Sequence, residues 1–261
     1  MSAKLKIKQS FADASASYDS VALLQRKVGS HLLQRVGVVN QYNTVVDLGC
    51  GTGFLTGELI KQTICPPQQI IALDIAFPML QTARNKLINN RSVAYLCADA
   101  ELLPFQPQSV DLVVSNLAFQ WCGNLEKTFG GIKRILKPEG RFFFTTFGAH
   151  TLNELKSAWK EVDDYAHVNA FYNAAQLQNF LQQAGFQQFE VETCSYTSIY
   201  ESVWELMAEL KQLGAHTVIE GCKKQLTSRS AMQRMIAAYQ KQDENGLIPA
   251  TFEVITVAVR M

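Results

Sequence analysis

Several marks of other protein classes are missing from this sequence of 261 residues. Its six cysteines, at positions 50, 65, 97, 122, 194 and 222, form no Cys-x-x-Cys pair. The lysines of residues 4–8 are not followed by the apolar segment of a secretion signal. Scattered thiols in such a chain indicate a reduced, cytoplasmic protein without a disulfide framework or a zinc site.

Long apolar runs and an excess of charge of one sign are also missing. No stretch approaches the roughly 18 apolar residues of a membrane span, and no repeat or low-complexity segment occurs. A net charge of +1 gives no general attraction to nucleic acid. We therefore expect a monomer with no membrane, nucleic-acid or metal partner. The apolar share of 48% is sufficient for one large α/β domain, with or without an insertion.

One stretch, residues 43–53, predicts a strand, a tight turn and a helix. Its sequence is Asn-Thr-Val-Val-Asp-Leu-Gly-Cys-Gly-Thr-Gly, in which an apolar run ends in Asp47. Gly49, Gly51 and Gly53 follow at alternate positions. Glycine suits a turn at which the backbone lies against a ligand, because it carries no Cβ.

The glycine spacing separates two nucleotide cofactors. A dinucleotide fingerprint, Gly-x-Gly-x-x-Gly, would need its third glycine at position 54, which is Phe54. Alternating glycines behind an acid are instead typical of enzymes that bind S-adenosylmethionine (SAM). The acid accepts hydrogen bonds from the ammonium group of SAM, and free N–H groups of the turn receive its carboxylate.

Three more polar residues stand at the ends of predicted strands. Asp74, Asp99 and Asn116 end or follow apolar runs that predict the second, third and fourth strands. Ligands of open parallel sheets bind at the carboxyl ends of the strands. Asp74 lies 21 residues beyond Gly53, a separation typical of an acid that binds ribose hydroxyls, although such an acid also serves as a helix cap. Asp99 is placed to reach the adenine amino group.

The N-terminal leader offers two interpretations. Residues 9–19 are small and polar except for Phe11 and Tyr18, and Ser20 is expected to cap the next helix. The bulky side chains either anchor the leader by packing, or Tyr18 and Gln25 close over the cofactor. The predicted cofactor residues are Tyr18, Gln25, Asp47, Gly49, Gly51, Gly53, Asp74, Ile75, Met79, Asp99, Ala100, Asn116 and Leu117.

The C-terminal half predicts strands over 141–147, 186–198 and 252–259, with a helix over 151–165. About fifty residues between the last two strands are too many for a hairpin loop, so we predict an inserted helical lid. The predicted organisation is a helical leader or cap at 1–40, a core at 41–200 and 246–261, and a lid at 201–245.

The order of these elements resembles the class I SAM-dependent methyltransferases. The resemblance implies a Rossmann-like α/β fold with a seven-stranded, mostly parallel sheet, an antiparallel last strand, N-terminal helices and the inserted lid. Six stretches resemble the malonyl-acyl-carrier-protein O-methyltransferases of biotin synthesis: 17–26, 115–122, 151–159, 167–169, 210–215 and 226–229. This chain departs from that family's pattern at Ala170, which replaces an arginine, and at Gly148-Ala149-His150, which replaces Gly-Pro-Gly.

The resemblance implies methyl transfer from SAM to the free carboxylate of a malonyl thioester, carried by acyl carrier protein or by coenzyme A. The ester then primes the pimeloyl chain of biotin. A carboxyl group is ionised at neutral pH, with a pKa near ~4, so no general base is required. A cation must hold the carboxylate, and Arg229 is the leading candidate, before Arg26 and Lys223.

Each substrate-side residue also has a purely structural interpretation. An arginine can be a solvated surface charge, His167 can be a hydrogen-bonded structural residue, and Trp121 beside Gln120 can be core. The predicted positioning residues are Tyr18, His167 and Arg229; the predicted substrate-binding residues are Arg229, Arg26, Gln120, Trp121 and Lys223. A basic face for an acidic carrier protein is expected from Lys133, Arg134, Lys223, Lys224 and Arg229.

Three other functions compete with this interpretation. A quinone C-methyltransferase would need an apolar lid and often a base, whereas this lid carries Lys223, Lys224 and Arg229. A non-catalytic SAM-binding protein would not need every cofactor position to be intact. A dinucleotide oxidoreductase conflicts with Phe54.

Overall fold

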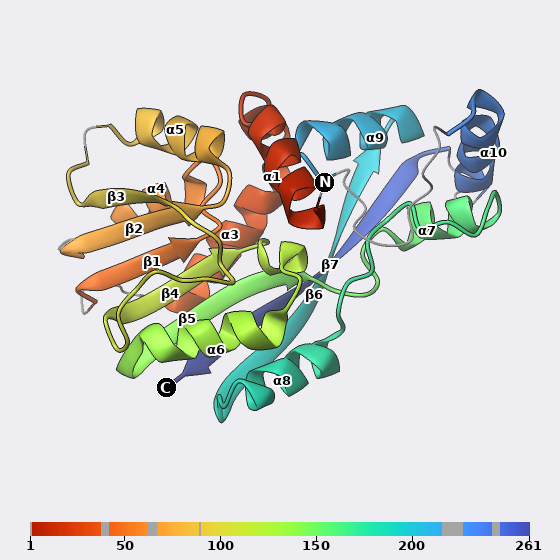
Figure 1. Cartoon of the computed structure of the whole chain (residues 1–261). Helices are drawn as coiled ribbons and strands as arrows, with labels where there is room; N and C mark the ends of the chain where they lie inside the picture. Colours follow the sequence, from red (N-terminus) through yellow and green to blue (C-terminus); the bar gives the residue numbers. More distant parts are fainter. Residues whose placement is uncertain (1, 38–41, 62–66, 89, 216–226, 242–245) are drawn as a thin grey trace.

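The computed structural model describes residues 2–37, 42–61, 67–88, 90–215, 227–241 and 246–261. A seven-stranded sheet forms its centre (Figure 1). The strands are β1 (Thr44–Leu48), β2 (Gln69–Asp74), β3 (Val93–Cys97), β4 (Val110–Asn116), β5 (Leu136–Phe147), β6 (Gln188–Tyr200) and β7 (Ile248–Arg260). The helices are α1 (Ala3–Ala14), α2 (Tyr18–Val21), α3 (Leu23–Val36), α4 (Phe54–Lys61), α5 (Phe77–Lys86), η1 (Phe119–Trp121), α6 (Leu125–Ile135), α7 (Asn153–Lys160), α8 (Ala174–Gln183), α9 (Val203–Gln212) and α10 (Arg229–Gln240).

The strand order is β3-β2-β1-β4-β5-β7-β6. The first five strands run parallel, and β7 runs antiparallel to both β5 and β6. The order reverses between β1 and β4, which is the switch point at which ligands of open α/β sheets bind. The predicted seven-stranded sheet with an antiparallel last strand is confirmed.

Helices cover both faces of the sheet because its inner strands are apolar on both faces. Leu32 of α3 and Leu59 of α4 pack with Val45 and Ile70 on one face, and α5 lies over the same face through Leu80. On the other face, α6 and α8 bury Phe129 and related side chains against the sheet. The carboxyl ends of the parallel strands stay free of these helices and are available for a site.

The leader crosses that free edge. In Figure 1, α1 lies between α5 and α9, above the ends of the parallel strands. At the α9 side, the backbone of Gly214 comes so close to α1 that a Cβ there would lie 2.8 Å from the Ser10 carbonyl oxygen. The Ser17 hydroxyl also donates to the Gln212 carbonyl at 3.1 Å. The leader therefore joins the edge formed by the carboxyl ends of the parallel strands to α9.

Several local predictions were wrong in detail. Ser20 does not cap α3, since its hydroxyl donates back to Ser17 and the N-cap position is Ala22. The helix expected over 151–165 is only α7, and β6 and β7 are each 13 residues long. Helix α8 was not predicted at all, although Asn173 and Gln176 form the capping box that begins it.

The inserted segment between β6 and β7 contains α9 and α10, as predicted for a helical lid. Helix α10 packs on α7 through a cluster that includes Leu155, Trp159, Met235 and Tyr239. Within the described part of the chain, no helix has the length and apolar character needed to cross a membrane.

Candidate active site

The glycine turn after β1 needs the residues that it has. Gly49 and Gly53 have φ angles of 77° and 84°, in the left-handed region that favours glycine. A Cβ on Gly49 would lie 2.4 Å from the Cβ of Ala118, and one on Gly53 would lie 2.9 Å from the Cβ of Ala83. The turn is thus packed tightly against the loop after β4 and against helix α5, and its backbone forms part of two cavities.

Both cavities lie at the carboxyl ends of the strands. The larger is about 780 Å³, partly open to solvent, and the smaller is about 420 Å³. They share Tyr18, Gly49, Gly51 and Asn116 in their walls. The larger cavity also has Asp74, Ile75, Met79, Asp99, Ala100, Leu117 and Trp121 in its wall, and the smaller one has Gln25, Arg26, Asp47 and Thr52. The structure thus brings together most of the predicted cofactor residues; Gly53 borders neither cavity.

The smaller cavity contains two acceptors that have no donor. Asp47 Oδ1 and Gln25 Oε1 are buried and have no hydrogen-bond partner among the described residues. The other oxygen of Asp47 accepts a hydrogen bond from Thr56 Oγ1 at 2.5 Å. Burial raises the pKa of Asp47 to about 7, although the bonds from Thr56 act to lower it. An unpartnered buried acceptor is costly, so both groups are suited to a ligand that supplies N–H donors.

Arg26 lines the same cavity. One of its guanidinium nitrogens donates to the Asp19 carbonyl oxygen at 2.8 Å, and it forms no ion pair within the described ranges. The Asp19 carboxylate is itself occupied, by Thr52 at 2.7 Å and by Lys86. A cation without an ion pair, beside two acceptors without donors, is complementary to the zwitterionic end of an amino acid.

Asp74 lines the larger cavity, and the N-cap position of α5 is Ala76, not Asp74. Its Oδ2 accepts from the N–H of Gly51 at 2.9 Å, and its Oδ1 accepts from the N–H of Ala76 at 2.8 Å. Burial raises the pKa of Asp74, opposed by these backbone hydrogen bonds. Each oxygen has further acceptor capacity, and Asp74 lines the larger cavity, so the carboxylate is suited to a vicinal diol bound there.

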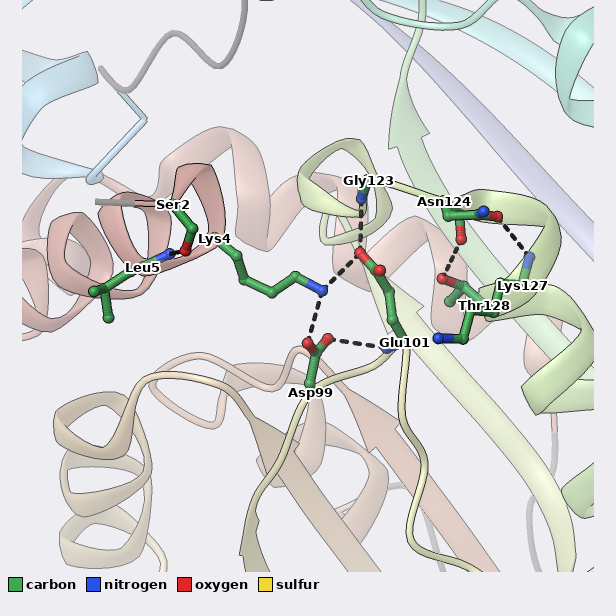
Figure 2. A network of polar contacts seen from close by, with 9 residues as sticks. All are labelled: Ser2, Lys4, Leu5, Asp99, Glu101, Gly123, Asn124, Lys127 and Thr128. Carbon is green, nitrogen blue, oxygen red and sulfur yellow. Dashed lines mark hydrogen bonds and ion pairs between the residues drawn. The ribbon is translucent and has the colours of Figure 1, made fainter.

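Lys4 is a site residue that the sequence did not single out. Figure 2 shows its ammonium group between Asp99 and Glu101, at 2.7 Å from an oxygen of each. Burial alone would lower the pKa of Lys4, but the bonds to Asp99 and Glu101 outweigh it and raise the pKa. Glu101 also accepts from the Gly123 N–H at 2.7 Å. Helix α1 is thereby fastened to the loop after β3 that carries the predicted adenine-binding acid.

Aromatic side chains close the larger cavity from the leader side. Phe11 of α1 meets Trp121 edge-on, with ring centroids 5.3 Å apart. Tyr18 packs with Phe11 against Ala76 and Met79, and burial, with Asp74 and Asp19 nearby, raises its pKa. The leader aromatics both pack and border the cavity, so the two interpretations of Tyr18 are compatible.

The side chain of Asn116 has a structural role. Its amide donates to the Gln25 carbonyl at 2.9 Å and accepts from Thr145 Oγ1 at 2.8 Å. Leu117 follows with a φ of 51°, held by two hydrogen bonds from its N–H to Thr145. Asn116 therefore fixes α3 to the sheet edge, and what it contributes to the cavities is its side-chain surface.

Comparison with known proteins identifies the family. The family described as "Methyltransferase domain" matches residues 46–144. The chain is 38% identical to malonyl-[acyl-carrier protein] O-methyltransferase of Gallionella capsiferriformans, over 97% of this chain and 89% of that one. The chain belongs to the malonyl-[acyl-carrier protein] O-methyltransferase family.

Two further proteins extend the comparison. The chain is 39% identical to the biotin biosynthesis bifunctional protein BioHC of Cellvibrio japonicus, matching 96% of this chain but spanning only 49% of that protein's length. Phosphoethanolamine N-methyltransferase 2 of Haemonchus contortus, solved with S-adenosyl-L-methionine, superposes with a TM-score of 0.59 at 21% identity, covering 95% of this chain and 57% of that one. Membership of this methyltransferase family identifies SAM as the methyl donor, and the solved structure shows the shared fold.

The substrate-side predictions for this family member are less well supported by geometry. His167 stacks on Trp159, with centroids 3.6 Å apart, and its Nε2 lies 2.8 Å from Asp163 Oδ1. It borders neither cavity. These contacts favour the structural role of His167 over a hydrogen bond to substrate.

Of the other predicted cations, Arg229, Lys133 and Arg134 are described by the structure, and none of the three lines either cavity. Arg229 begins α10 as an exposed residue and borders neither cavity. Lys223 and Lys224 lie outside the described residues. Arg134 donates to the carbonyls of Phe105 and Leu103, and Lys133 to that of Gly185. Lys133 and Arg134 therefore brace the core, and the expected basic face stays a prediction.

Gln120 is also bound within the protein. Its amide donates to the Leu117 carbonyl at 2.6 Å and accepts from Thr146 Oγ1 at 3.2 Å. It supports the strained Leu117 turn and does not border either cavity. No group of three metal-ligating side chains occurs among the described residues.

Proposed function

We propose that this chain transfers the methyl group of SAM to the free carboxylate of a malonyl group carried by acyl carrier protein. Family membership supports this reaction. The single structural observation that carries it is the small cavity with two unpartnered acceptors, Asp47 Oδ1 and Gln25 Oε1, beside the unpaired Arg26. That cavity matches the amino-acid end of SAM, and it joins a larger one suited to adenosine.

The residues present fit SAM from end to end. Asp47 and Gln25 would accept hydrogen bonds from its ammonium group, and Arg26 would pair with its carboxylate. Asp74 would accept bonds from the ribose hydroxyls, and Asp99 from the adenine amino group. Arg26, which the sequence suggested as an acceptor-binding residue, is thus reassigned to the cofactor.

When bound, SAM supplies a methyl group on a cationic sulfur. A lone pair of the malonyl carboxylate would form the new O–CH3 bond as the C–S bond breaks, and the electron pair of the C–S bond would stay on sulfur. No proton moves, because a carboxyl group with a pKa near ~4 is already ionised at neutral pH. The chain therefore needs no general base, and its task is to align the reactants and exclude water.

The leader provides much of that exclusion. Lys4, Ile7 and Phe11 of α1 and Tyr18 of α2 all border the larger cavity, so SAM is enclosed from this side. We propose that residues 1–40 act as this cap, that 41–200 with 246–261 form the core, and that 201–245 form a lid over the acceptor. Both cavities are lined by one chain, so a monomer suffices.

The product, a malonyl methyl ester, has lost the charge that distinguishes malonyl from an ordinary acyl primer. We propose that it primes the chain from which the pimeloyl part of biotin is made. The names of the relatives support this place in metabolism. The same names also favour a carrier protein, rather than coenzyme A, as the carrier of the malonyl thioester.

The test is methyl transfer from methyl-labelled SAM to malonyl-acyl carrier protein, with acetyl-acyl carrier protein and malonyl-coenzyme A as parallel acceptors. We expect label on the malonyl carrier protein, absent from the acetyl one and released by mild base, as a methyl ester requires. Label on coenzyme A at equal efficiency would refute the carrier preference. SAM binding without label on any malonyl thioester would refute the acceptor.

A further inference from the structure

The described cations named so far leave the acceptor carboxylate without a partner. Arg26 is assigned above to the amino-acid end of the cofactor, and Lys4 is paired with Asp99 and Glu101. Arg229 is exposed on α10, and Lys133 and Arg134 are bound to carbonyls. One other cation is half-buried near this edge of the sheet. It is Lys156 of α7, which forms no ion pair among the described residues.

The ammonium group of Lys156 has spare hydrogen-bonding capacity. Its Nζ donates to the Ala149 carbonyl at 2.9 Å and lies 5.3 Å from the centroid of the Phe171 ring. An ammonium has three N–H groups, so two remain for a ligand. Burial lowers the pKa of Lys156, and the nearby charge of Glu253 opposes that shift. Glu253 forms no ion pair with Lys156, and one of its oxygens accepts from the His150 N–H at 2.9 Å.

A continuous apolar wall links Lys156 to the larger cavity. The ring of Phe171 lies 5.8 Å from that of Phe147, at the end of β5. Phe147 in turn packs against the cluster that contains Leu117, which borders the cavity. Lys156 itself lines neither cavity. Its ammonium group would therefore hold a carboxylate that lies against Phe147 and Phe171, between Lys156 and the edge of the larger cavity at which the methyl group would lie.

Backbone strain occurs at both ends of this wall. Leu117, after β4, has a φ of 51°, and Leu152, just before α7, has a φ of 57°. Such conformations are unfavourable for leucine and persist only where the surroundings fix them, often at functional sites. The two loops that carry them are the one bordering the cavity and the one from which Ala149 holds Lys156.

From this geometry we propose that Lys156 binds the carboxylate of the acceptor, which rests on the function proposed above. Its two free N–H groups hold one carboxylate oxygen and leave a lone pair of the other for the methyl group. Methylation turns the anion into a neutral ester, so the same contact that selects malonyl over acetyl is weakened in the product. Lys156 then aids both specificity and product release.

The test compares Lys156→Met with two matched variants. Lys156→Arg keeps the charge, and Lys160→Met removes an exposed lysine from the same helix. We expect Lys156→Met to raise the KM for malonyl-acyl carrier protein tenfold or more, with affinity for S-adenosylhomocysteine within twofold of the wild type. The KM of Lys156→Arg should stay close to the wild-type value, and Lys160→Met should leave the KM unchanged. A KM for Lys156→Met within twofold of the wild-type value would overturn the proposal.

A binding measurement separates this proposal from the function on which it rests. We expect malonate to bind the complex of the wild-type protein with S-adenosylhomocysteine, and to bind that of Lys156→Met at least tenfold more weakly. Should Lys156→Met fail to fold, Lys156→Gln takes its place. Wild-type protein that does not methylate malonyl thioesters would refute the function alone. Equal malonate affinity in wild type and variant, or none in either, would refute the role of Lys156.

Discussion

The cofactor side and the acceptor side of the active site are built in different ways. On the cofactor side, backbone turns and buried carboxylates at successive strand ends form the walls, and two acceptors stand ready for donors. On the acceptor side, aromatic rings from β5 and the loop before α8 form an apolar surface with one half-buried lysine beside it. In the proposed arrangement the methyl donor and the acceptor use separate parts of the molecule, so a substitution on one side should leave binding on the other side unchanged.

The largest expected effect comes from Gly49→Ala on the cofactor side. Its Cβ would lie 2.4 Å from the Cβ of Ala118, at a φ of 77°. Clash and backbone strain together should reduce the free energy of unfolding by on the order of 3 kcal/mol. We expect SAM binding to be lost by calorimetry. Gly37→Ala, at a φ of 70° with open space around it, is the control for backbone strain alone. An equal loss of unfolding free energy in both variants would show that the clash with Ala118 does not contribute.

Asp47→Asn should separate binding from stability. It removes the charge that faces the ammonium of SAM, and a charge-assisted bond of about 1.5–3 kcal/mol corresponds to a roughly 10- to 150-fold loss of SAM affinity. The unliganded variant should be at least as stable as the wild type at pH 8, because a buried ionised carboxylate is gone. Calorimetry and thermal melts measure both. An unchanged affinity would show that Asp47 does not hold SAM.

The pH dependence of SAM binding should follow Asp47. Burial raises the pKa of Asp47 to about 7. The ammonium group of SAM binds best to the ionised carboxylate of Asp47. Affinity should therefore rise from pH 5.5 to about 7 and then level off, with a slope approaching tenfold per pH unit at the acid end. The unliganded fold shows the opposite trend, since it loses the stability of the protonated form as the pH rises through 7. Asp47→Asn should flatten both curves, and a wild-type affinity independent of pH would contradict the assignment.

The smallest effect is expected from Lys4→Met. It frees α1 from Asp99 and Glu101 (Figure 2), but these pairs are partly exposed and worth only about 1 kcal/mol. We expect a fewfold faster dissociation of SAM in stopped-flow measurements, with the acceptor KM unchanged. Lys6→Met, on the exposed side of the same helix, should have no effect. A larger change in acceptor KM than in SAM release would mean that the leader serves the acceptor side.

The same comparison explains what could be predicted from the sequence. Asp47, the glycines and Asp74 were predictable because a tight turn and a strand end impose residue types at fixed spacing. The structure places all of them except Gly53 in the cavity walls. Lys4 was not, because its partners lie 95 and 97 positions away in the sequence. Ile7, Phe11 and Ala14 after a Ser2 cap are the helical pattern that could have revealed α1.

The acceptor side was harder to predict because no local pattern encodes it. Arg229 was singled out for its charge within an expected lid, but α10 exposes it and places it on neither cavity wall. Lys156 belongs to an ordinary amphipathic helix, and only the fold brings it against Phe171. Helix α8, which was not predicted, is rich in glutamine, so its apolar periodicity is weak. Its capping box could nevertheless have been recognised in the sequence.

A crystal structure of the chain with S-adenosylhomocysteine and malonate would test the division into two sides most directly. The account predicts the homocysteine ammonium within hydrogen-bond distance of Asp47 Oδ1 and Gln25 Oε1, its carboxylate on Arg26, and malonate on Lys156 beside the sulfur edge of the cofactor. Malonate seated on Arg26, or a homocysteine end turned away from Asp47, would contradict it.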